Sequence, residues 1–535
     1  MAASFTAHLA LPSRFARIYS SRAYRDPASF ALDVLFLLTL GAQLIPLWFW
    51  TYFPSLDGPS HLYNASILLN YSKTPLYQQY YRITFHTPGN VLTQLVLASL
   101  LAVLPPLAAE KTFLTLYLVS FPVAFRALLQ ALGGQARSFS FFAFVLSYNH
   151  FLHLGFWNFC AAIPLALAAL AYVAAGKDRP LRGGRLAALA ALALAAYLCH
   201  PMAWAIAAMG AIWLLAWERL AVPVPKVSRS FKQRRLAAAA VLLPGLLYLL
   251  STRVPGQLSF PRFSFWGAAR SLYQLGFLNS YGQSEWWLRR TTLACALLLI
   301  VFAAMTGGLR RFKNSMLILS LALAPVIAFG PDAFGTLGLI RERLAIFAFL
   351  FLCAGLAMVQ GPSKMLCPLL AIFLSGLSVV ALWRRQPAYK YWNARLQEYA
   401  ALAPRIPANS VLLALSFTDP EEHSSPTVHA TGIWTPKSLI DLSNFEARDV
   451  IFPVRFRNVR SPQTDIYVPL KVYLERLASR QFQLDYILFD AEPATLMRPQ
   501  ELESSSGILK EFALDYASSP GGHLRLYRRR KHGSE

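Results

Sequence analysis

One acidic residue stands out by its neighbours in the sequence. Asp57 lies in the segment SLDGPSHLYN, in which Gly58 and Pro59 favour a turn directly after the acid. If a helix begins at Pro59, His61 and Asn64 follow at one-turn spacing on a shared face. A carboxylate held there could act as a general base toward a hydroxyl group. The alternative is an aspartate that only caps the same helix.

Cationic residues elsewhere could bind a phosphate. Arg341 and Arg343 stand two positions apart, with Glu342 between them, where the chain re-enters an apolar stretch. Arginine binds phosphate oxygens through paired hydrogen bonds and stays charged. His200, which lies between two apolar stretches and precedes Pro201, is a further candidate for donor-phosphate contact. The alternatives are interfacial anchors for the arginines and a buried structural group for the histidine.

Further polar residues could contact a sugar. Asn158 follows Gly155-Phe156-Trp157 and opens an apolar stretch, so it either caps a helix or binds hydroxyl groups. Glu285 precedes two tryptophans in the aromatic segment 253–290. Trp and Tyr commonly anchor a chain at the membrane interface, but they also line sugar or lipid grooves. We therefore count His61, Asn64, Asn158 and Glu285 as candidate substrate-binding residues.

The composition identifies the elements that must position these residues. The 535 residues are 56% hydrophobic and 14% charged, with a mean hydropathy of +0.42. A soluble domain carries about 25% charged residues, so soluble, disordered and coiled-coil classes are excluded. The net charge of +24 does not indicate nucleic-acid binding, because the Lys and Arg mostly mark loops between apolar segments. The fold class is a polytopic α-helical membrane protein.

We expect about 11 transmembrane helices. The candidates are 31–50, 112–131, 139–153, 157–175, 186–200, 202–217, 236–252, 291–307, 315–330, 344–360 and 365–383. The basic segments 176–185, 218–235 and 308–314 are placed in the cytoplasm with residues 1–30. The spans alternate between the two sides of the membrane in agreement with these placements only if 90–108, which is broken by Pro105-Pro106, does not cross and is an interfacial or re-entrant helix. The first loop, 51–111, and the C-terminal tail then lie outside.

The tail differs from the membrane half in its charges. Residues 1–383 hold nine of the 26 acids, and residues 384–535 hold the other 17. Strand-like runs at 411–415, 450–456 and 486–490, with helical stretches at 390–402 and 469–480, predict a small soluble α/β domain. We therefore divide the chain into a cytoplasmic segment 1–30, a transmembrane domain 31–383 and an extracytoplasmic domain 384–535.

Cysteines and clustered acids give no metal site. The five cysteines lie in apolar segments without CxxC spacing, which supports neither a disulfide scaffold nor a zinc ribbon. In the tail, His423 and His429 with Asp419, Glu421 and Glu422 fit no tight ligand spacing, so a solvated loop is the better interpretation.

The order of several short motifs resembles the GT-C superfamily of polytopic glycosyltransferases, among them the bacterial aminoarabinose and mannosyl transferases. These motifs are an acid at the start of a long first outer loop, an interfacial helix after it, FRALLQALGG (125–134), HLGFWNFCAAIPLALAALAY (153–172), the turn Leu198-Cys199-His200-Pro201, and an Arg-rich outer turn at 340–343. They cover most of residues 31–383.

The resemblance implies an enzyme that takes a sugar from a polyprenyl-phosphate donor at the outer leaflet. The acceptor would be a glycan, lipid or protein of the cell envelope, Asp57 would be the catalytic base, and Arg341, Arg343 and His200 would hold the leaving phosphate. Many members have paired acids in the first loop, whereas no second acid follows Asp57 before Glu110. A divalent metal is therefore not supported by a paired-acid motif, and a lone base with a phosphate clamp is compatible with a metal-free inverting transfer.

The expected location is the bacterial inner membrane, with the N-terminus in the cytoplasm and the C-terminal domain outside. Two alternatives are a transporter or flippase for a lipid-linked substrate and a non-catalytic scaffold of envelope assembly. A transporter predicts ionisable residues along the bilayer midplane. A scaffold predicts that Asp57 and Arg341 lie far apart, whereas the enzyme predicts one cavity lined by Asp57, Arg341 and Arg343.

Overall fold

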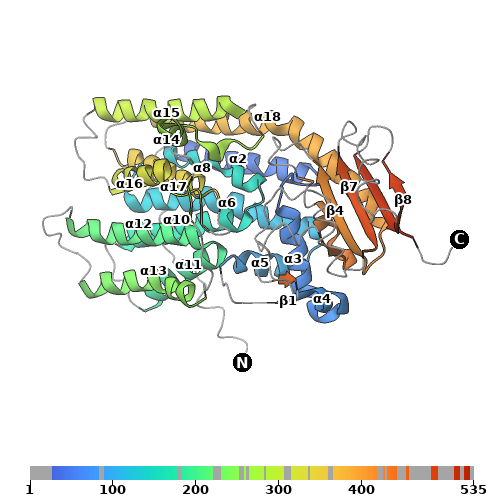
Figure 1. Cartoon of the computed structure of the whole chain (residues 1–535). Coiled ribbons are helices and arrows are strands. Elements are labelled where there is room, and N and C mark those ends of the chain that lie inside the picture. Colours follow the sequence, from blue (N-terminus) through green and yellow to red (C-terminus); the bar gives the residue numbers. More distant parts are fainter. Residues whose placement is uncertain are drawn as a thin grey trace.

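The structure is a computed structural model of the whole chain. It describes residues 27–83, 89–176, 183–220, 231–251, 258–260, 264–281, 285–306, 315–334, 338–359, 366–417, 426–427, 430–442, 454–456, 484–491, 511–518 and 523–530. Within these residues, long helices lie side by side and lead into a β-sheet at one end, which we term the sheet end (Figure 1).

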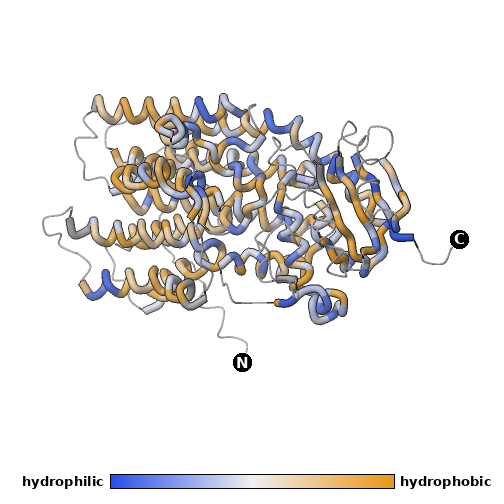
Figure 2. Tube along the Cα trace, viewed as in Figure 1, coloured by the Kyte–Doolittle hydropathy of each residue, from blue (hydrophilic) through white to orange (hydrophobic). Residues whose placement is uncertain are grey.

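The long helices form an apolar bundle. They are α2 (Pro27–Phe49), α6 (Pro106–Leu132), α10 (Trp157–Ala175), α11 (Gly184–Cys199), α12 (Pro201–Leu220), α13 (Phe231–Ser251), α15 (Trp286–Met305), α16 (Ser315–Phe329), α17 (Ile340–Ala357) and α18 (Leu366–Leu402). Among the described residues, α2, α6, α10, α15 and the stretch Leu366–Arg405 are long and apolar enough to cross a membrane. Their hydrophobic residues dominate the bundle in Figure 2. The prediction of a helical membrane protein is confirmed at this level, and the number of 11 spans stays a prediction.

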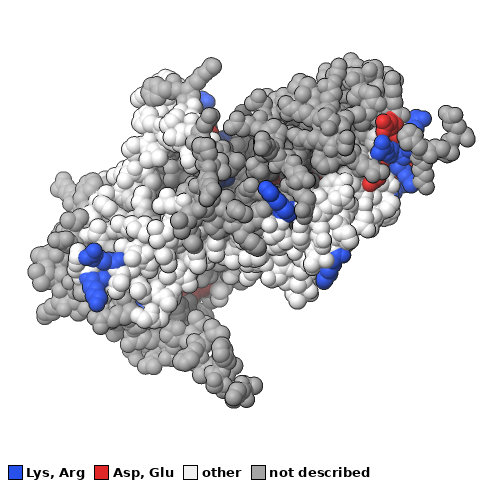
Figure 3. All heavy atoms as spheres, turned by 60° about the horizontal axis from the view of Figure 1, so that its bottom comes forward, with Lys and Arg blue, Asp and Glu red and all other residues white. Residues whose placement is uncertain are grey.

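The bundle surface suits a lipid environment. Large apolar side chains such as Leu38, Phe49, Leu298, Met305 and Trp383 are exposed, which is unfavourable in water but suited to lipid. On the face drawn in Figure 3, charged side chains of the described residues form small separate groups on a largely uncharged surface.

The helix ends agree with the predicted distribution of basic loops. Figure 1 shows that α12 ends and α13 begins at the end of the bundle away from the sheet. At the same end of the bundle, α15 ends and α16 begins. These helix ends flank the basic segments 218–235 and 308–314. The helix ends that flank these basic segments and the sheet therefore lie at opposite ends of the bundle, while the orientation in a membrane stays a prediction.

The segment predicted as a span over 139–153 is not one helix. It forms three short helices, α7 (Ala136–Phe139), α8 (Phe142–Ser147) and α9 (His150–His153). The break between α8 and α9 follows from Asn149, whose side chain accepts a hydrogen bond from the Leu152 N–H at 3.0 Å and so caps α9. The segment is enclosed by protein, which tolerates irregular backbone where lipid would not.

The segment 90–108 forms the short helix α5 (Val91–Leu101), and α6 begins at Pro106. Eleven residues span about 16 Å, whereas a bilayer core is about 30 Å thick. The helix is too short to cross, which agrees with the predicted interfacial or re-entrant helix.

The C-terminal sheet has the strand order β5-β4-β7-β9-β8. Its strands are β4 (Val411–Phe417), β5 (Ile440–Asp441), β7 (Tyr486–Ala491), β8 (Phe512–Ala517) and β9 (Leu524–Arg529). β4 pairs in parallel with β5 and β7, while β9 is antiparallel to β7 and β8. The strands predicted at 411–415 and 486–490 are confirmed. Of the run 450–456, only β6 (Val454–Phe456) is described, and it pairs with β1 (Tyr81–Ile83) of the first loop. The predicted helix at 469–480 lies outside the described residues.

The alternation of buried residues along the strands gives the sheet two apolar faces. One face contains Val411, Leu413, Ile487 and Phe489, which pack with Tyr63, Ile67, Tyr77 and Tyr81 of the first loop. The other contains Leu412, Ala414, Tyr486 and Leu488, which pack with Leu396, Tyr399 and Leu402 at the end of α18. The first loop and the tail therefore share a hydrophobic core. Residue 384, the predicted domain boundary, lies inside α18, so a continuous helix crosses that position.

Candidate functional site

A tight turn at residues 154–158 is the point around which the candidate residues gather. Gly155, with φ +79°, lies between α9 and α10, and a Cβ there would be 2.6 Å from the backbone nitrogen of Asp57. The Leu56 N–H donates to the His153 carbonyl at 2.9 Å, and the Asp57 N–H donates to the Leu154 carbonyl at 3.1 Å. Only glycine lets the two backbone segments approach this closely. The turn therefore fixes where Asp57 lies.

Asp57 occupies the N-cap position of α3 (Gly58–Asn70) and is half-buried. The helix begins here because Pro59 fits its first turn. The Asp57 side chain makes no capping hydrogen bond to that turn. The structure therefore does not support the alternative that this carboxylate is a helix cap.

His61 ties three elements together. Its Nε2–H donates to the Gly155 carbonyl at 2.9 Å, and Gln94 of α5 donates to its Nδ1 at 2.8 Å. The Trp157 ring stacks on the imidazole, with ring centroids 5.6 Å apart. Burial lowers the pKa of His61 to about 4, so the ring is neutral at pH 7. Both ring nitrogens are used within the protein, which suits a positioning role near Asp57 better than proton transfer.

Arg343 and His200 form a second contact with the same turn. The guanidinium of Arg343 is buried, lies over the Phe156 ring at 4.7 Å, and donates to His200 Nε2 at 3.2 Å. The Phe159 ring packs edge-on against His200, with centroids 5.2 Å apart. Among the described residues, Arg343 forms no ion pair with a carboxylate, and its Nε and His200 Nδ1 have no hydrogen-bond partner. The structure thus brings Arg343, His200 and Asp57 to one turn.

Arg341 has different surroundings. Its Nε donates to the Ile327 carbonyl at 2.6 Å, and its Nη2 donates to the Ala328 carbonyl at 3.1 Å and to Ser271 Oγ at 2.6 Å. These are carbonyls at the end of α16, where a helix leaves acceptors unpaired. Two residues two positions apart on a helix point about 200° apart. The expected shared clamp of Arg341 and Arg343 is therefore not formed in this structure.

The two candidate asparagines are both buried, Asn158 beside this turn and Asn64 on α3. Asn158 lies in the first turn of α10, where its Oδ1 accepts from the Phe159 N–H at 3.0 Å. The Oδ1 of Asn64 has no hydrogen-bond partner among the described residues. Asn158 therefore satisfies the start of its helix, while Asn64 keeps an acceptor for another group.

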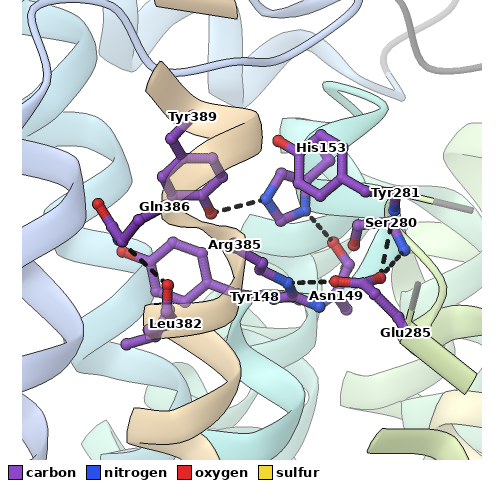
Figure 4. Close-up of polar contacts among 10 residues, drawn as sticks. All are labelled: Tyr148, Asn149, His153, Ser280, Tyr281, Glu285, Leu382, Arg385, Gln386 and Tyr389. Carbon is purple, nitrogen blue, oxygen red and sulfur yellow. Dashed lines mark hydrogen bonds and ion pairs between the residues drawn. The ribbon is translucent and has the colours of Figure 1, made fainter. Parts of the chain in front are cut away.

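Glu285 belongs to a separate cluster, drawn in Figure 4. Its carboxylate pairs with Arg385 of α18 at 2.5 Å and accepts from the N–H groups of Ser280 and Tyr281. Arg385 also donates to the Tyr148 carbonyl at 2.7 Å. Both partners of the ion pair are almost fully buried. Glu285 is thus part of a closed ion pair rather than a carboxylate open to substrate.

Sequence reasoning missed the partners of this cluster. His153 donates from Nδ1 to the Asn149 carbonyl at 3.0 Å and contacts the Tyr389 hydroxyl at 2.9 Å (Figure 4). Arg385 and Tyr389 lie beyond the predicted boundary at 384, in the part of the chain assigned to the extracytoplasmic domain. The run Tyr148-Asn149-His150 inside a predicted span was the one available signal.

No metal site is found among the described residues, which contain no group of three His, Cys, Asp or Glu side chains able to hold an ion. The cluster of His423, His429, Asp419, Glu421 and Glu422 lies outside the described residues.

Comparisons with known proteins give a likeness to solved structures alone. No family model matches the chain, and no curated protein matches it. The chain is similar to the oligosaccharyltransferase of Archaeoglobus fulgidus tethered to an acceptor peptide containing the NVT sequon, with a TM-score of 0.43 and 10% identity over 94% of this chain and 74% of that one. A structure of the same enzyme with Zn and sulfate gives a TM-score of 0.38 and 10% identity over 93% and 73%.

Proposed function

We propose that this protein is a membrane glycosyltransferase that transfers a sugar from a polyprenyl-phosphate donor to a glycan, lipid or protein acceptor. The acceptor hydroxyl oxygen attacks the anomeric carbon, and the bond from that carbon to the phosphate oxygen breaks. Asp57 takes the hydroxyl proton, and polyprenyl phosphate leaves. A single displacement of this kind inverts the anomeric configuration and needs no metal.

The environment of Arg343 is the observation that carries this proposal. A buried charge without a counter-ion is costly, and proteins retain such charges where a ligand neutralises them. Its direct contacts among the described residues are an acceptor nitrogen of His200 and two aromatic rings, and the adjacent Glu342 acts on it through space without an ion pair in the described part of the chain. A phosphate monoanion or dianion on this guanidinium would supply the missing negative charge.

Asp57 is the group best placed to act as base. It is half-buried, it is not engaged in capping α3, and its backbone rests on the turn whose Phe156 ring contacts Arg343. A base and a phosphate-binding cation that share one turn can act on two ends of a single displacement. The assignment therefore rests on this shared turn.

The roles of the other candidates follow from their contacts. We assign the leaving phosphate to Arg343 and His200, and we assign Arg341 to the end of α16, whose carbonyls already use its donors. Asn64 keeps a role in sugar binding, while His61 and Asn158 hold the first turns of α3 and α10. Glu285 keeps Arg385 neutralised and contributes to the site only through the fold.

The cellular setting is part of the proposal. We place the protein in a bacterial inner membrane with the N-terminus in the cytoplasm and the sheet outside, because the helix ends that flank two basic segments lie at the opposite end of the bundle from the sheet. The sheet packs on α3, directly after Asp57, so the acceptor would enter between the sheet and the bundle.

The test is sugar transfer by the purified full-length protein in lipid nanodiscs, with a panel of synthetic polyprenyl-phosphate hexoses and pentoses. Asp57→Asn should lower kcat by about 10²- to 10⁴-fold, because amide nitrogen and oxygen cannot take the hydroxyl proton. Asp332→Asn, a matched change of another half-buried acid, should leave kcat unchanged. Full activity of Asp57→Asn with an unchanged fold would refute the base assignment.

A further inference from the structure

Helix α18 contacts the loop that precedes Asp57 along one of its faces. Gln386 accepts a hydrogen bond from Trp50 Nε1 at 2.8 Å, and Asn393 accepts one from the Tyr52 N–H at 2.9 Å. Between them, Tyr389 packs against the Phe53 ring, with centroids 6.1 Å apart. Positions 386, 389 and 393 are one and two turns apart and share a helix face. The whole loop from Trp50 to Phe53 therefore lies against α18.

Tyr389 also reaches the turn that holds Asp57. The Asn149 carbonyl can only accept, so the proton of His153 is on Nδ1 and its Nε2 accepts from the Tyr389 hydroxyl (Figure 4). The carbonyl of the same His153 accepts the Leu56 N–H, and the next carbonyl accepts the Asp57 N–H. Tyr389 and His153 are both fully buried. The Tyr389 hydroxyl thus fixes the ring of His153, whose backbone carbonyl binds the segment of Asp57.

The C-terminal end of α18 is fixed to the sheet. Arg395 pairs with Asp490 of β7 at 2.5 Å, and both are buried. Trp434 donates from Nε1 to the Tyr399 carbonyl at 3.0 Å. These contacts, with those of Gln386, hold α18 on both sides of Tyr389. The helix is therefore a rigid support for the loop and not only a membrane span.

We propose that Tyr389 is a positioning residue of the transfer reaction, which holds Asp57 in place through His153. This inference rests on the proposed function only for its effect on catalysis; the effect on the backbone stands by itself. The Tyr389 hydroxyl is buried and bonded to His153, so it does not touch substrate. It acts on catalysis through the backbone that holds Asp57.

Hydrogen exchange of the full-length protein in nanodiscs tests the backbone effect directly. Tyr389→Phe removes one oxygen atom and should speed exchange of the Leu56 and Asp57 amides about three- to tenfold. Tyr273→Phe is the control, because Tyr273 lies on another helix, α14 (Phe265–Tyr273), and its ring is exposed. Equal exchange at residues 56 and 57 in the two variants would overturn the inference.

Kinetics then separate positioning from a general loss of structure. Tyr389→Phe should lower kcat about tenfold and leave the KM for the polyprenyl-phosphate sugar unchanged, because the phosphate contacts of Arg343 are not altered. Faster exchange with an unchanged kcat would overturn the catalytic part. If Asp57→Asn keeps full transfer, the proposed function fails, while the exchange result still decides the backbone effect.

A second pair of variants covers the case in which Tyr389→Phe does not fold. Gln386→Met removes the acceptor for Trp50 at nearly constant volume, whereas Gln386→Glu retains it. Exchange over residues 50–57 should rise in Gln386→Met and return to the wild-type rate in Gln386→Glu. The same rate in both variants would contradict a supporting role of this helix face.

Discussion

Two buried arginines of the helical bundle have opposite surroundings. Arg385 has a carboxylate at 2.5 Å and a backbone carbonyl at 2.7 Å. Arg343 has two aromatic rings and the lone pair of one imidazole nitrogen. The first charge has a carboxylate partner within hydrogen-bond distance, whereas we propose that an anionic ligand neutralises the second. The comparison teaches that burial of an arginine does not indicate its role, whereas the presence of a counter-ion does.

The largest expected effect concerns the neutralised arginine. Glu285→Gln leaves Arg385 buried without a counter-ion and should lower the free energy of unfolding by about 3–5 kcal/mol. Denaturant unfolding of the purified protein measures this. The double variant Glu285→Gln with Arg385→Met should recover most of the loss, because no buried charge remains. A loss below about 1 kcal/mol in the single variant would remove the distinction between the two arginines.

A smaller effect on stability concerns His61, which lies one turn after Asp57 on α3. The pKa of His61 is about 4 in the folded protein and about 6.5 in an unfolded chain. Between these values only the unfolded chain binds the proton, so the contribution of a neutral His61 is complete above pH 6.5 and is lost as the pH falls to about 4. The loss should reach about 3 kcal/mol, measured as the pH dependence of unfolding. The same pH dependence in His61→Gln would contradict this account.

The smallest change in stability is expected for Arg343, and it separates the two arginines most clearly. Arg343→Met replaces an unneutralised buried charge with an apolar side chain of similar length. The free energy of unfolding should stay within about 1 kcal/mol of wild type or rise, although sugar transfer is lost. Unfolding and transfer are measured on one preparation. Destabilisation as large as that of Glu285→Gln would make Arg343 a structural residue.

The membrane helices could be predicted because apolar length is a property of each segment alone. The helix 157–175 has the predicted bounds, and α6 and α15 overlap the predicted spans 112–131 and 291–307 but begin earlier, at residues 106 and 286. The prediction of a span over 139–153 was wrong, because Asn149 bonds to Tyr117 of α6 and caps α9, which interrupts the helix. Apolar content does not distinguish a lipid-facing span from a segment enclosed by protein.

The candidate site was predictable only where its residues are close in sequence. The segment of Asp57 and His61 shows its helix start directly. By contrast, Tyr389 and His153 are 236 positions apart, and Arg385 and Glu285 are 100 apart, so no local pattern links them. The separation of Arg341 from Arg343 was readable in principle, because two positions on a helix never share a face.

The most direct test of the account is the affinity for polyprenyl monophosphate, without any sugar, measured on the nanodisc-embedded protein at constant ionic strength. Arg343→Gln should weaken binding at least about tenfold, since a hydrogen-bonded charge pair is lost, whereas Arg341→Gln, whose side chain holds the end of α16, should bind within about twofold of wild type. Equal affinities of wild type and Arg343→Gln, or a loss confined to Arg341→Gln, would contradict the assignment of the phosphate to Arg343.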